Sequence, residues 1–126
     1  MRRIRSKHMK PEMQVRAIVR ALGYRYRLHR KTLPGHPDII FPSLKKAIFV
    51  NGCFWHQHCS TRCKIQRVPK SNLEYWLPKL ERNRLRDIQN HKALRRLGWR
   101  VMTVWECEIR NVLTTERKLQ VFLESQ

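Results

Sequence analysis

Two short and almost wholly apolar runs, Asp38–Phe41 and Ala47–Val50, place the tightest constraint on the fold. Runs of this length that are apolar at nearly every position are typical of buried β-strands. The segment between them, Pro-Ser-Leu-Lys-Lys, is expected to be a turn. The sequence therefore predicts two neighbouring runs of buried strand in the first half of the chain.

The segments on either side carry helix and strand patterns of their own. Apolar residues on one face predict a helix from about Pro11 to Leu22. Strict alternation of apolar and basic side chains predicts a half-buried strand over Tyr24–Arg30. Further along the chain, Trp99–Glu106 is predicted to form another strand, and a closing helix is predicted from about Thr115.

Between the strands of the two halves, a helix is expected to begin near Ser71, to break or kink at Pro78, and to continue as a longer helix to about Leu97. The resulting order is helix, three strands, two helices, strand and helix. This order predicts one mixed α/β domain over residues 11–126, built around a small central sheet. Residues 1–10 are expected to form a basic N-terminal arm.

The excess of basic residues indicates which class of molecule the protein binds. Lys and Arg number 28 against 9 Asp and Glu, which gives a formal net charge of +19. The basic residues extend from Arg2 to Lys118, so a basic folded surface is favoured over a basic tail. Each neutralised phosphate releases counterions, and nucleic acid is therefore the leading partner.

A membrane partner and secretion are both disfavoured. The sequence has no long apolar run and no basic amphipathic helix with an aromatic face, as a membrane-bound chain would need. The N-terminal MRRIRSKHMK is charged with no apolar stretch behind it, unlike a secretory signal. We therefore expect a reducing, cytoplasmic setting, in which cysteines more often bind metals or stay free than form disulfides.

Five potential zinc ligands stand within eleven residues: Cys53, His56, His58, Cys59 and Cys63. Zinc takes four nitrogen or sulfur ligands in a tetrahedron, which such a cluster supplies. Cys107, at the end of a predicted strand, could bring a further sulfur to this loop. The alternative is a set of buried free thiols and surface histidines.

The few acidic residues stand at informative positions. Asp38 opens an apolar strand after a Pro-Gly-His-Pro turn, where its carboxylate suits Mg²⁺, although it could instead cap the turn. Asn83, Asp87 and His91 recur at four-residue spacing and share a helix face, on which Asp87 could also form a simple ion pair. Glu12 lies in the first turn of a helix, where the helix dipole already favours it.

Two large adjacent aromatics, Phe54 and Trp55, lie inside the Cys/His cluster. Aromatics in a basic loop can stack on bases or insert between them, although one of the two could equally belong to the core. Trp99 and Trp105 fall on one side of a predicted strand and are expected in the core. Trp76 is left unassigned by pattern alone.

Four stretches resemble the signature blocks of a known family: LPGHPDIIF, AIFVNGCFWHQH, PKSNLEYWLPKLERN and LGWRVMTVWECE. They occur in the order found in the very short patch repair endonucleases, and RSKHM with KPEMQVRAIVRALGYRYRLHRKTLPG resembles the N-terminal region of that family. The resemblance covers nearly the whole chain. It implies a restriction-endonuclease-like α/β fold of the PD-(D/E)xK type. It also implies an enzyme that nicks one DNA strand 5′ of the T in a T:G mismatch left by deamination of 5-methylcytosine.

The resemblance also implies catalytic roles. Asp38 resembles the metal-binding aspartate, and the backbone carbonyl of Val50 resembles a second contact to magnesium. His56 resembles the catalytic histidine, which would act as general base toward water. Glu12 and Asp87 resemble two acids that arrange the water and the histidine.

Further positions are implied to contact DNA or zinc. Phe54 and Trp55 resemble the aromatic wedge beside the mismatch, and Trp76 resembles a further DNA-facing aromatic. Asn83, on the same helix, is assigned to the DNA-binding set with them. Three ligands of a structural zinc ion are implied as well: Cys53, His58 and Cys107.

The sequence departs from the family pattern at three places. Cys59 is adjacent to His58 and reaches the same tetrahedral metal with difficulty, so Cys63 is favoured as the fourth zinc ligand. Asn51 replaces a residue that is commonly His. The N-terminal region is short and leaves Met9 as the apolar side chain for the minor groove.

The sequence thus predicts a monomeric, magnesium-dependent and zinc-stabilised endonuclease that acts on double-stranded DNA. Two alternatives remain open. A non-catalytic zinc module that binds DNA structures would need neither Asp38 nor His56. A nickase without mismatch preference would need both.

Overall fold

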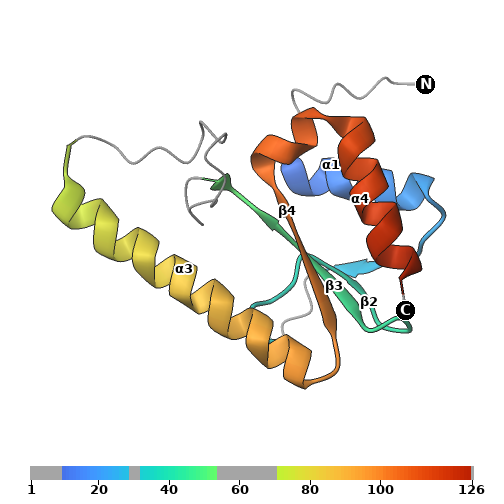
Figure 1. Cartoon of the computed structure of the whole chain (residues 1–126), viewed down its shortest axis with the longest axis horizontal. Coiled ribbons are helices and arrows are strands. Elements are labelled where there is room, and N and C mark those ends of the chain that lie inside the picture. The colour runs from blue at the N-terminus through green and yellow to red at the C-terminus, as the bar shows by residue number, and fades with distance from the viewer. Residues whose placement is uncertain (1–9, 29–31, 54–70, 126) are drawn as a thin grey trace.

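The structure is a computed structural model that describes residues 10–28, 32–53 and 71–125. Over these ranges, a four-stranded sheet lies between two layers of helices (Figure 1). In chain order the elements are α1 (Pro11–Ala21), β1 (Arg27–Leu28), β2 (Ile39–Phe41), β3 (Lys46–Asn51), α3 (Leu73–Arg96), β4 (Arg100–Trp105), the 3-10 helix η2 (Glu106–Arg110) and α4 (Val112–Glu124). This is the mixed α/β architecture that the sequence predicts.

The sheet has the order β1-β2-β3-β4. The first two pairs are antiparallel, and β3 and β4 are parallel along their whole length, from Lys46 opposite Arg100 to Asn51 opposite Trp105. A short turn joins β2 to β3, as antiparallel neighbours allow. Parallel neighbours need a crossover connection, and α3 lies in the crossover from β3 to β4.

The main core lies between the sheet and the layer of α1 and α4, which Figure 1 shows on one side of the strands. Side chains alternate along a strand, so every second residue of β2 and β3 points into this core. Its buried members are Val15, Ile18, Val19, Ile39, Phe41, Ile48, Val104, Ile109, Leu119 and Leu123. Fully burying one such side chain stabilises the fold by about 1.5–3 kcal/mol.

Helix α3 covers the opposite face of the sheet (Figure 1). The ring of Phe49 packs against the imidazole of His91, with ring centroids 4.7 Å apart. Leu80 and Leu94 are the buried apolar residues of this helix. Because Ile40 lies on the other side of β2 from Ile39 and Phe41, it faces the α3 layer.

The first helix confirms its prediction, with Val15, Ile18 and Val19 on its buried face. The strand predicted over Tyr24–Arg30 is shorter within the described residues, where only Arg27–Leu28 is a strand. These two residues pair with Ile39 and Ile40, and β2 is itself only three residues long.

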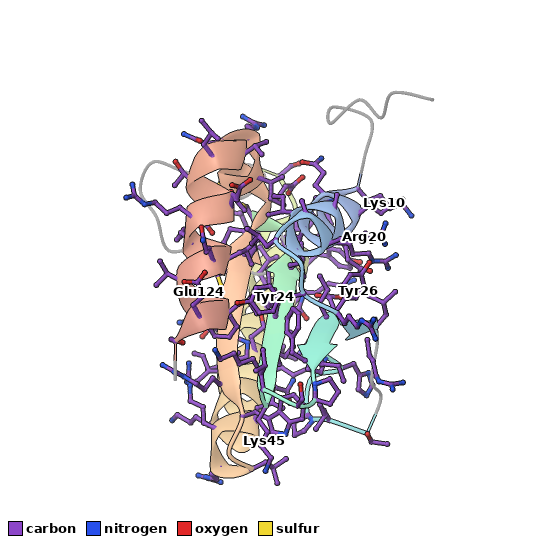
Figure 2. All side chains as sticks on the ribbon, turned by 90° about the vertical axis from the view of Figure 1, so that its right-hand side faces the viewer. Lys10, Arg20, Tyr24, Tyr26, Lys45 and Glu124 are labelled. Atoms are coloured by element: carbon purple, nitrogen blue, oxygen red, sulfur yellow. The ribbon has the colours of Figure 1, made fainter. Side chains whose placement is uncertain are left out.

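The predicted alternation nevertheless holds before β1. Tyr24 and Tyr26 are half-buried, whereas Arg25 and Arg27 are exposed. Tyr24 meets Phe41 edge-on, with ring centroids 6.2 Å apart. Figure 2 shows both tyrosines beside α1, on the segment that leads from this helix to the sheet.

The predicted break at Pro78 is wrong, because α3 continues through it. A proline removes the hydrogen bond to the carbonyl four residues earlier, which here belongs to Glu74. Both residues are exposed, so water can satisfy that carbonyl. The helix also begins two residues later than Ser71, after Asn72, whose φ of 57° is left-handed.

Two further predictions near the C-terminal half are corrected. Trp99 and Trp105 are only half-buried, because the fully buried residue of β4 is Val104, on the side facing α1 and α4. The closing helix begins at Val112 rather than near Thr115, since the Asn111 side chain caps it.

Within the described residues, no helix is long and apolar enough to span a bilayer.

Candidate active site and cysteine pair

The carboxylate of Asp38 is held against strand β3. The Asp38 amide donates to the Ile48 carbonyl at 3.1 Å. The Val50 amide in turn donates to Oδ2 of Asp38 at 2.7 Å. The structure therefore brings together the two residues that the sequence assigns to magnesium.

The turn before Asp38 is clamped between the sheet and α3. Gly35 has a φ of +77°, a region that favours glycine. A Cβ placed there would lie 2.9 Å from Cβ of Asn90 and 3.1 Å from the ring of Phe49. This close approach fixes the backbone three residues ahead of the carboxylate.

The predicted polar face of α3 is present. Asn83, Asp87 and His91 are all half-buried, as residues on the sheet-facing side of this helix should be. His91 contacts Phe49 of β3. Position 38 precedes Ile39 and by alternation falls on the side of β2 that α3 covers.

Glu12 belongs to the other layer of helices. It lies in the first turn of α1, where it is half-buried and forms an ion pair with Arg16, one turn along the helix. The three acids singled out by the sequence therefore come from three elements: the start of β2, the first turn of α1 and the middle of α3.

Cys53 and Cys107 are side by side at the ends of two parallel strands. Asn51 and Trp105 are opposite one another, so the residues two positions further on also meet. The Cys107 amide donates to Sγ of Cys53 at 3.4 Å. Cys53 is fully buried, whereas Cys107 is half-buried.

Glu106 supports this pair and has no role in the sequence-based prediction. Its Oε1 accepts a hydrogen bond of 3.4 Å from the Cys53 amide. Only its position next to Cys107, in the Trp-Glu-Cys triplet, could have pointed to it. Glu108 in the same 3-10 helix accepts from the Trp105 amide at 2.9 Å, which ties η2 to the end of β4.

Several predicted site residues lie outside the described residues: Met9, Phe54, Trp55, His56, His58, Cys59 and Cys63. Among the residues that are described, no three or more His, Cys, Asp or Glu side chains are grouped so that they could hold a metal ion. The cysteine pair is therefore the part of the predicted zinc site on which the structure bears.

The N-terminal part of α3 presents aromatic and cationic groups together. Trp76 is half-buried and meets Tyr75 edge-on, with ring centroids 4.9 Å apart. Tyr75 is 59% exposed, and the Lys79 ammonium lies 5.4 Å from the centre of its ring. Exposed aromatic rings with a nearby cation suit contact with nucleic acid.

Buried Lys46 joins the sheet to the end of α4. Its ammonium donates to the carbonyl of Leu123 at 2.7 Å and to that of Ser125. A cation at the C-terminal end of a helix is favoured by the helix dipole. Burial, and then the charge of Arg100, lower the pKa of Lys46 below its usual 10.5.

Comparison with known proteins identifies the family. Residues 1–62 match the family described as DNA mismatch endonuclease Vsr. The chain is 49% identical to the type II nicking enzyme V.XorIIP of Xanthomonas oryzae pv. oryzae, over 98% of this chain and 89% of that protein. It is 36% identical to the DNA mismatch endonuclease Vsr of Escherichia coli, over 87% of this chain and 69% of that protein. The chain belongs to the Vsr family.

This Vsr-family protein is an endodeoxyribonuclease that nicks DNA. A second nicking enzyme among the relatives, V.NmeAIP of Neisseria meningitidis, is 40% identical over 94% of this chain and 83% of its own length. The fold resembles that of the catalytic domain of the homing endonuclease I-Bth0305I, with a TM-score of 0.62 at 20% identity, over 93% of this chain and 99% of that domain. The restriction-endonuclease-like α/β fold fits this likeness, and membership of the family favours the enzyme over a non-catalytic module.

Proposed function

We propose that this Vsr-family protein nicks one strand of double-stranded DNA 5′ of the T in a T:G mismatch, by magnesium-dependent hydrolysis centred on Asp38. The observation that supports this most is the 2.7 Å hydrogen bond from the Val50 amide to the Asp38 carboxylate. It orients a carboxylate at the start of a strand beside the backbone of β3. Carboxylate and carbonyl oxygens are the hard ligands that magnesium prefers.

Each residue of the proposed hydrolytic centre has a separate role. Asp38 and the carbonyl of Val50 would hold the metal, and magnesium bound there would stabilise the charge that develops on the phosphate and on the leaving oxygen. His56 takes a proton from the attacking water, as an imidazole can near neutral pH. Asp87 and Glu12 orient the histidine and the water from the α3 and α1 layers.

A structural zinc ion is proposed to stabilise the segment that follows β3. Cys53, His58, Cys63 and Cys107 would hold the ion, and four protein ligands would leave no open position for chemistry. The hydrogen bond between the Cys107 amide and the Cys53 sulfur supports the long-range part of this site. The ion would fix Phe54, Trp55 and His56 relative to the sheet.

Selectivity is proposed to come from aromatic side chains. Contacts of Lys and Arg to phosphate give affinity but carry no sequence information. Phe54 and Trp55 enter the base stack, where unstacking costs least at a mismatch. Trp76, Asn83 and Met9 make further contacts to the DNA, and the protein acts as a monomer.

Nicking of a T:G duplex with Mg²⁺ tests the hydrolytic centre. Asp38→Asn and His56→Ala should each abolish nicking and leave DNA binding largely intact. Glu81→Gln is the matched control, because this carboxylate is exposed on α3 and pairs with Arg84. Full activity in the Asp38 or His56 variant contradicts the assignment.

Metal analysis of the purified protein tests the zinc site, with about one zinc ion per chain expected. Cys63→Ser should lose both metal and stability, and Cys59→Ser should lose neither. The reverse result moves the fourth ligand to Cys59. A Cys107→Ser variant that keeps its full zinc content rules out the long-range ligand.

Competition between T:G and C:G duplexes of the same sequence tests the selectivity. Base–aromatic stacking contributes about 1–3 kcal/mol per base, so Trp55→Ala should reduce T:G nicking roughly tenfold or more. Its effect on non-specific binding should be smaller. Equal nicking of both duplexes by the unmodified protein would leave a nickase without mismatch preference.

A further inference from the structure

A groove between β4 and α4 lies away from Asp38. Its volume is about 620 Å³, and the strand side is formed by Arg100–Met102. Arg100 stands at the start of the β3–β4 ladder, whereas Val50, which holds Asp38, is opposite Val104 near its end. Strand β3 lies between β4 and Asp38, and Asp38 falls on the α3 side of the sheet whereas the groove lies on the α4 side, so the groove is separate from the proposed hydrolytic centre.

The helical wall of the groove is a distinct face of α4. Its residues recur at intervals of three and four, as one face of a helix does: Thr114, Arg117, Lys118, Val121, Phe122 and Ser125. The face that packs into the core is the adjacent one, formed by Thr115, Leu119 and Leu123. In Figure 2, α4 is in front of the sheet, and Glu124 marks the end of the helix toward the turn at Lys45. Helix α4 therefore offers one face to the core and a neighbouring face to this groove.

The floor of the groove is apolar. Val101 and Met102 form it from the strand, and Val121 and Phe122 form it from the helix. Val121 is 65% exposed. Apolar side chains gathered in an exposed hollow mark a surface that another molecule covers.

The rim of the groove is cationic. Arg100, Arg117 and Lys118 line it, and none of the described lining residues is acidic. Lys118 forms an ion pair with Glu108 beside the groove, which offsets its charge. The rim therefore carries positive charge from three side chains around the apolar floor.

We propose that this groove binds an acidic segment of a partner protein, which inserts one or two large apolar side chains between β4 and α4. Carboxylates of the segment meet the arginines, and its apolar side chains cover the floor. A DNA backbone would match the rim and leave the floor unused. A second copy of this chain fits poorly, because each copy carries a net charge of +19.

Fluorescence anisotropy with two labelled peptides tests the proposal. One peptide alternates Asp and Glu with Leu and Phe, and the other has the same length and charge with Ser in place of Leu and Phe. The full-length protein should bind the first roughly tenfold more tightly or better, because only this peptide covers the apolar floor. Val121→Ser should remove most of that difference. Leu113→Ser is the matched control, since Leu113 is 79% exposed on the same helix and outside the groove.

A charge reversal tests the rim. Arg117→Glu should weaken the apolar acidic peptide roughly tenfold more than Arg110→Glu does, because Arg110 is exposed but lies outside the groove. Nicking by the Val121→Ser variant should equal that of the unmodified protein. Nicking and peptide binding are thus measured independently. A wrong assignment of Asp38 would therefore not change the result of the peptide experiment.

Four results would overturn the proposal. Equal binding of the two peptides, or equal effects of Val121→Ser and Leu113→Ser, would show that the apolar floor is not a docking site. A tenfold loss of duplex DNA affinity in Val121→Ser would assign the groove to DNA instead. Self-association in sedimentation that Val121→Ser abolishes would assign it to a second copy of the chain.

Discussion

Replacing Gly35 by alanine tests whether the turn before Asp38 is clamped between the sheet and α3. The φ of +77° costs an alanine about 1–2 kcal/mol. Its Cβ would also lie 2.9 Å from Cβ of Asn90, which is fixed to a helix backbone, so the turn or the helix must shift. Overpacking of this kind typically costs a further 1–3 kcal/mol or so. Alanine also lowers the conformational entropy of the unfolded chain, which offsets about 0.4–1 kcal/mol of this loss in stability. The expected net loss in the free energy of unfolding is therefore about 1–4.6 kcal/mol.

Gly23→Ala is the matched control. Gly23 has a similar φ of +91°, at the end of α1, but a Cβ there would meet nothing within 4 Å. This variant should lose only the conformational part, about 1 kcal/mol or less. Urea denaturation of both variants measures the difference, which isolates the contact with α3 and Phe49.

The same pair of variants links the turn to function. Displacing the backbone at position 35 displaces Asp38, three residues later. A misplacement of about 1 Å at a reacting group can reduce the rate a hundredfold, so Gly35→Ala should nick DNA at least tenfold more slowly than Gly23→Ala at a temperature where both are folded. Equal unfolding free energies in the two variants would refute the clamp, and equal nicking would refute its link to the carboxylate.

Three further predictions concern the fold. Burial lowers the pKa of Lys46 below its usual 10.5, so the unfolded chain binds more protons between the two values and the stability gained from this residue rises with pH across that window; Lys46→Met should flatten this rise in urea denaturations carried out as the pH approaches 10.5 from below. Leu94→Ala should reduce the free energy of unfolding by about 2–5 kcal/mol, because Leu94 is a fully buried residue of α3, whereas Leu97→Ala, at a residue 54% exposed, should cost about 0.5 kcal/mol or less. Asn111→Ala should cost about 1 kcal/mol in the same assay, because the Asn111 side chain accepts a hydrogen bond of 3.1 Å from an amide in the first turn of α4; an unchanged transition would show that this cap is replaced by water.

Features that depend on the local pattern could be predicted from the sequence. The apolar runs at Ile39–Phe41 and Lys46–Asn51 are strands in the structure, and α1 has the predicted buried face. The shared face of Asn83, Asp87 and His91 follows from helix geometry alone. In each case the pattern lies within a few neighbouring residues, so it does not depend on how the rest of the chain packs.

The signature blocks are also local stretches of sequence, and they were enough to identify the family. Asp38 and Val50 stand in separate blocks, and the sequence assigned both to one metal without showing how they meet. Their hydrogen bond depends on the pairing of β2 with β3, which brings the start of one strand beside the end of the other.

Other features were decided only by tertiary structure. Pro78 reads locally as a helix breaker, yet the exposed first turns of α3 tolerate the lost hydrogen bond. Lys46 reads as a surface residue, yet the end of α4 buries it and supplies two carbonyl partners. The identity of a residue reports its preference, whereas its burial depends on which element packs over it.

The cysteine pair shows most directly which features the sequence predicts and which depend on the tertiary structure. The sequence established that Cys53 and Cys107 follow two strands, and chemistry made both candidates for zinc. Their contact, across 54 positions of the chain, exists because β3 and β4 pair in parallel with Asn51 opposite Trp105. A different register would separate the two sulfurs without changing any local pattern. Because pairing between distant strands is set by the packing of the whole sheet between its helical layers, only the tertiary structure could decide it.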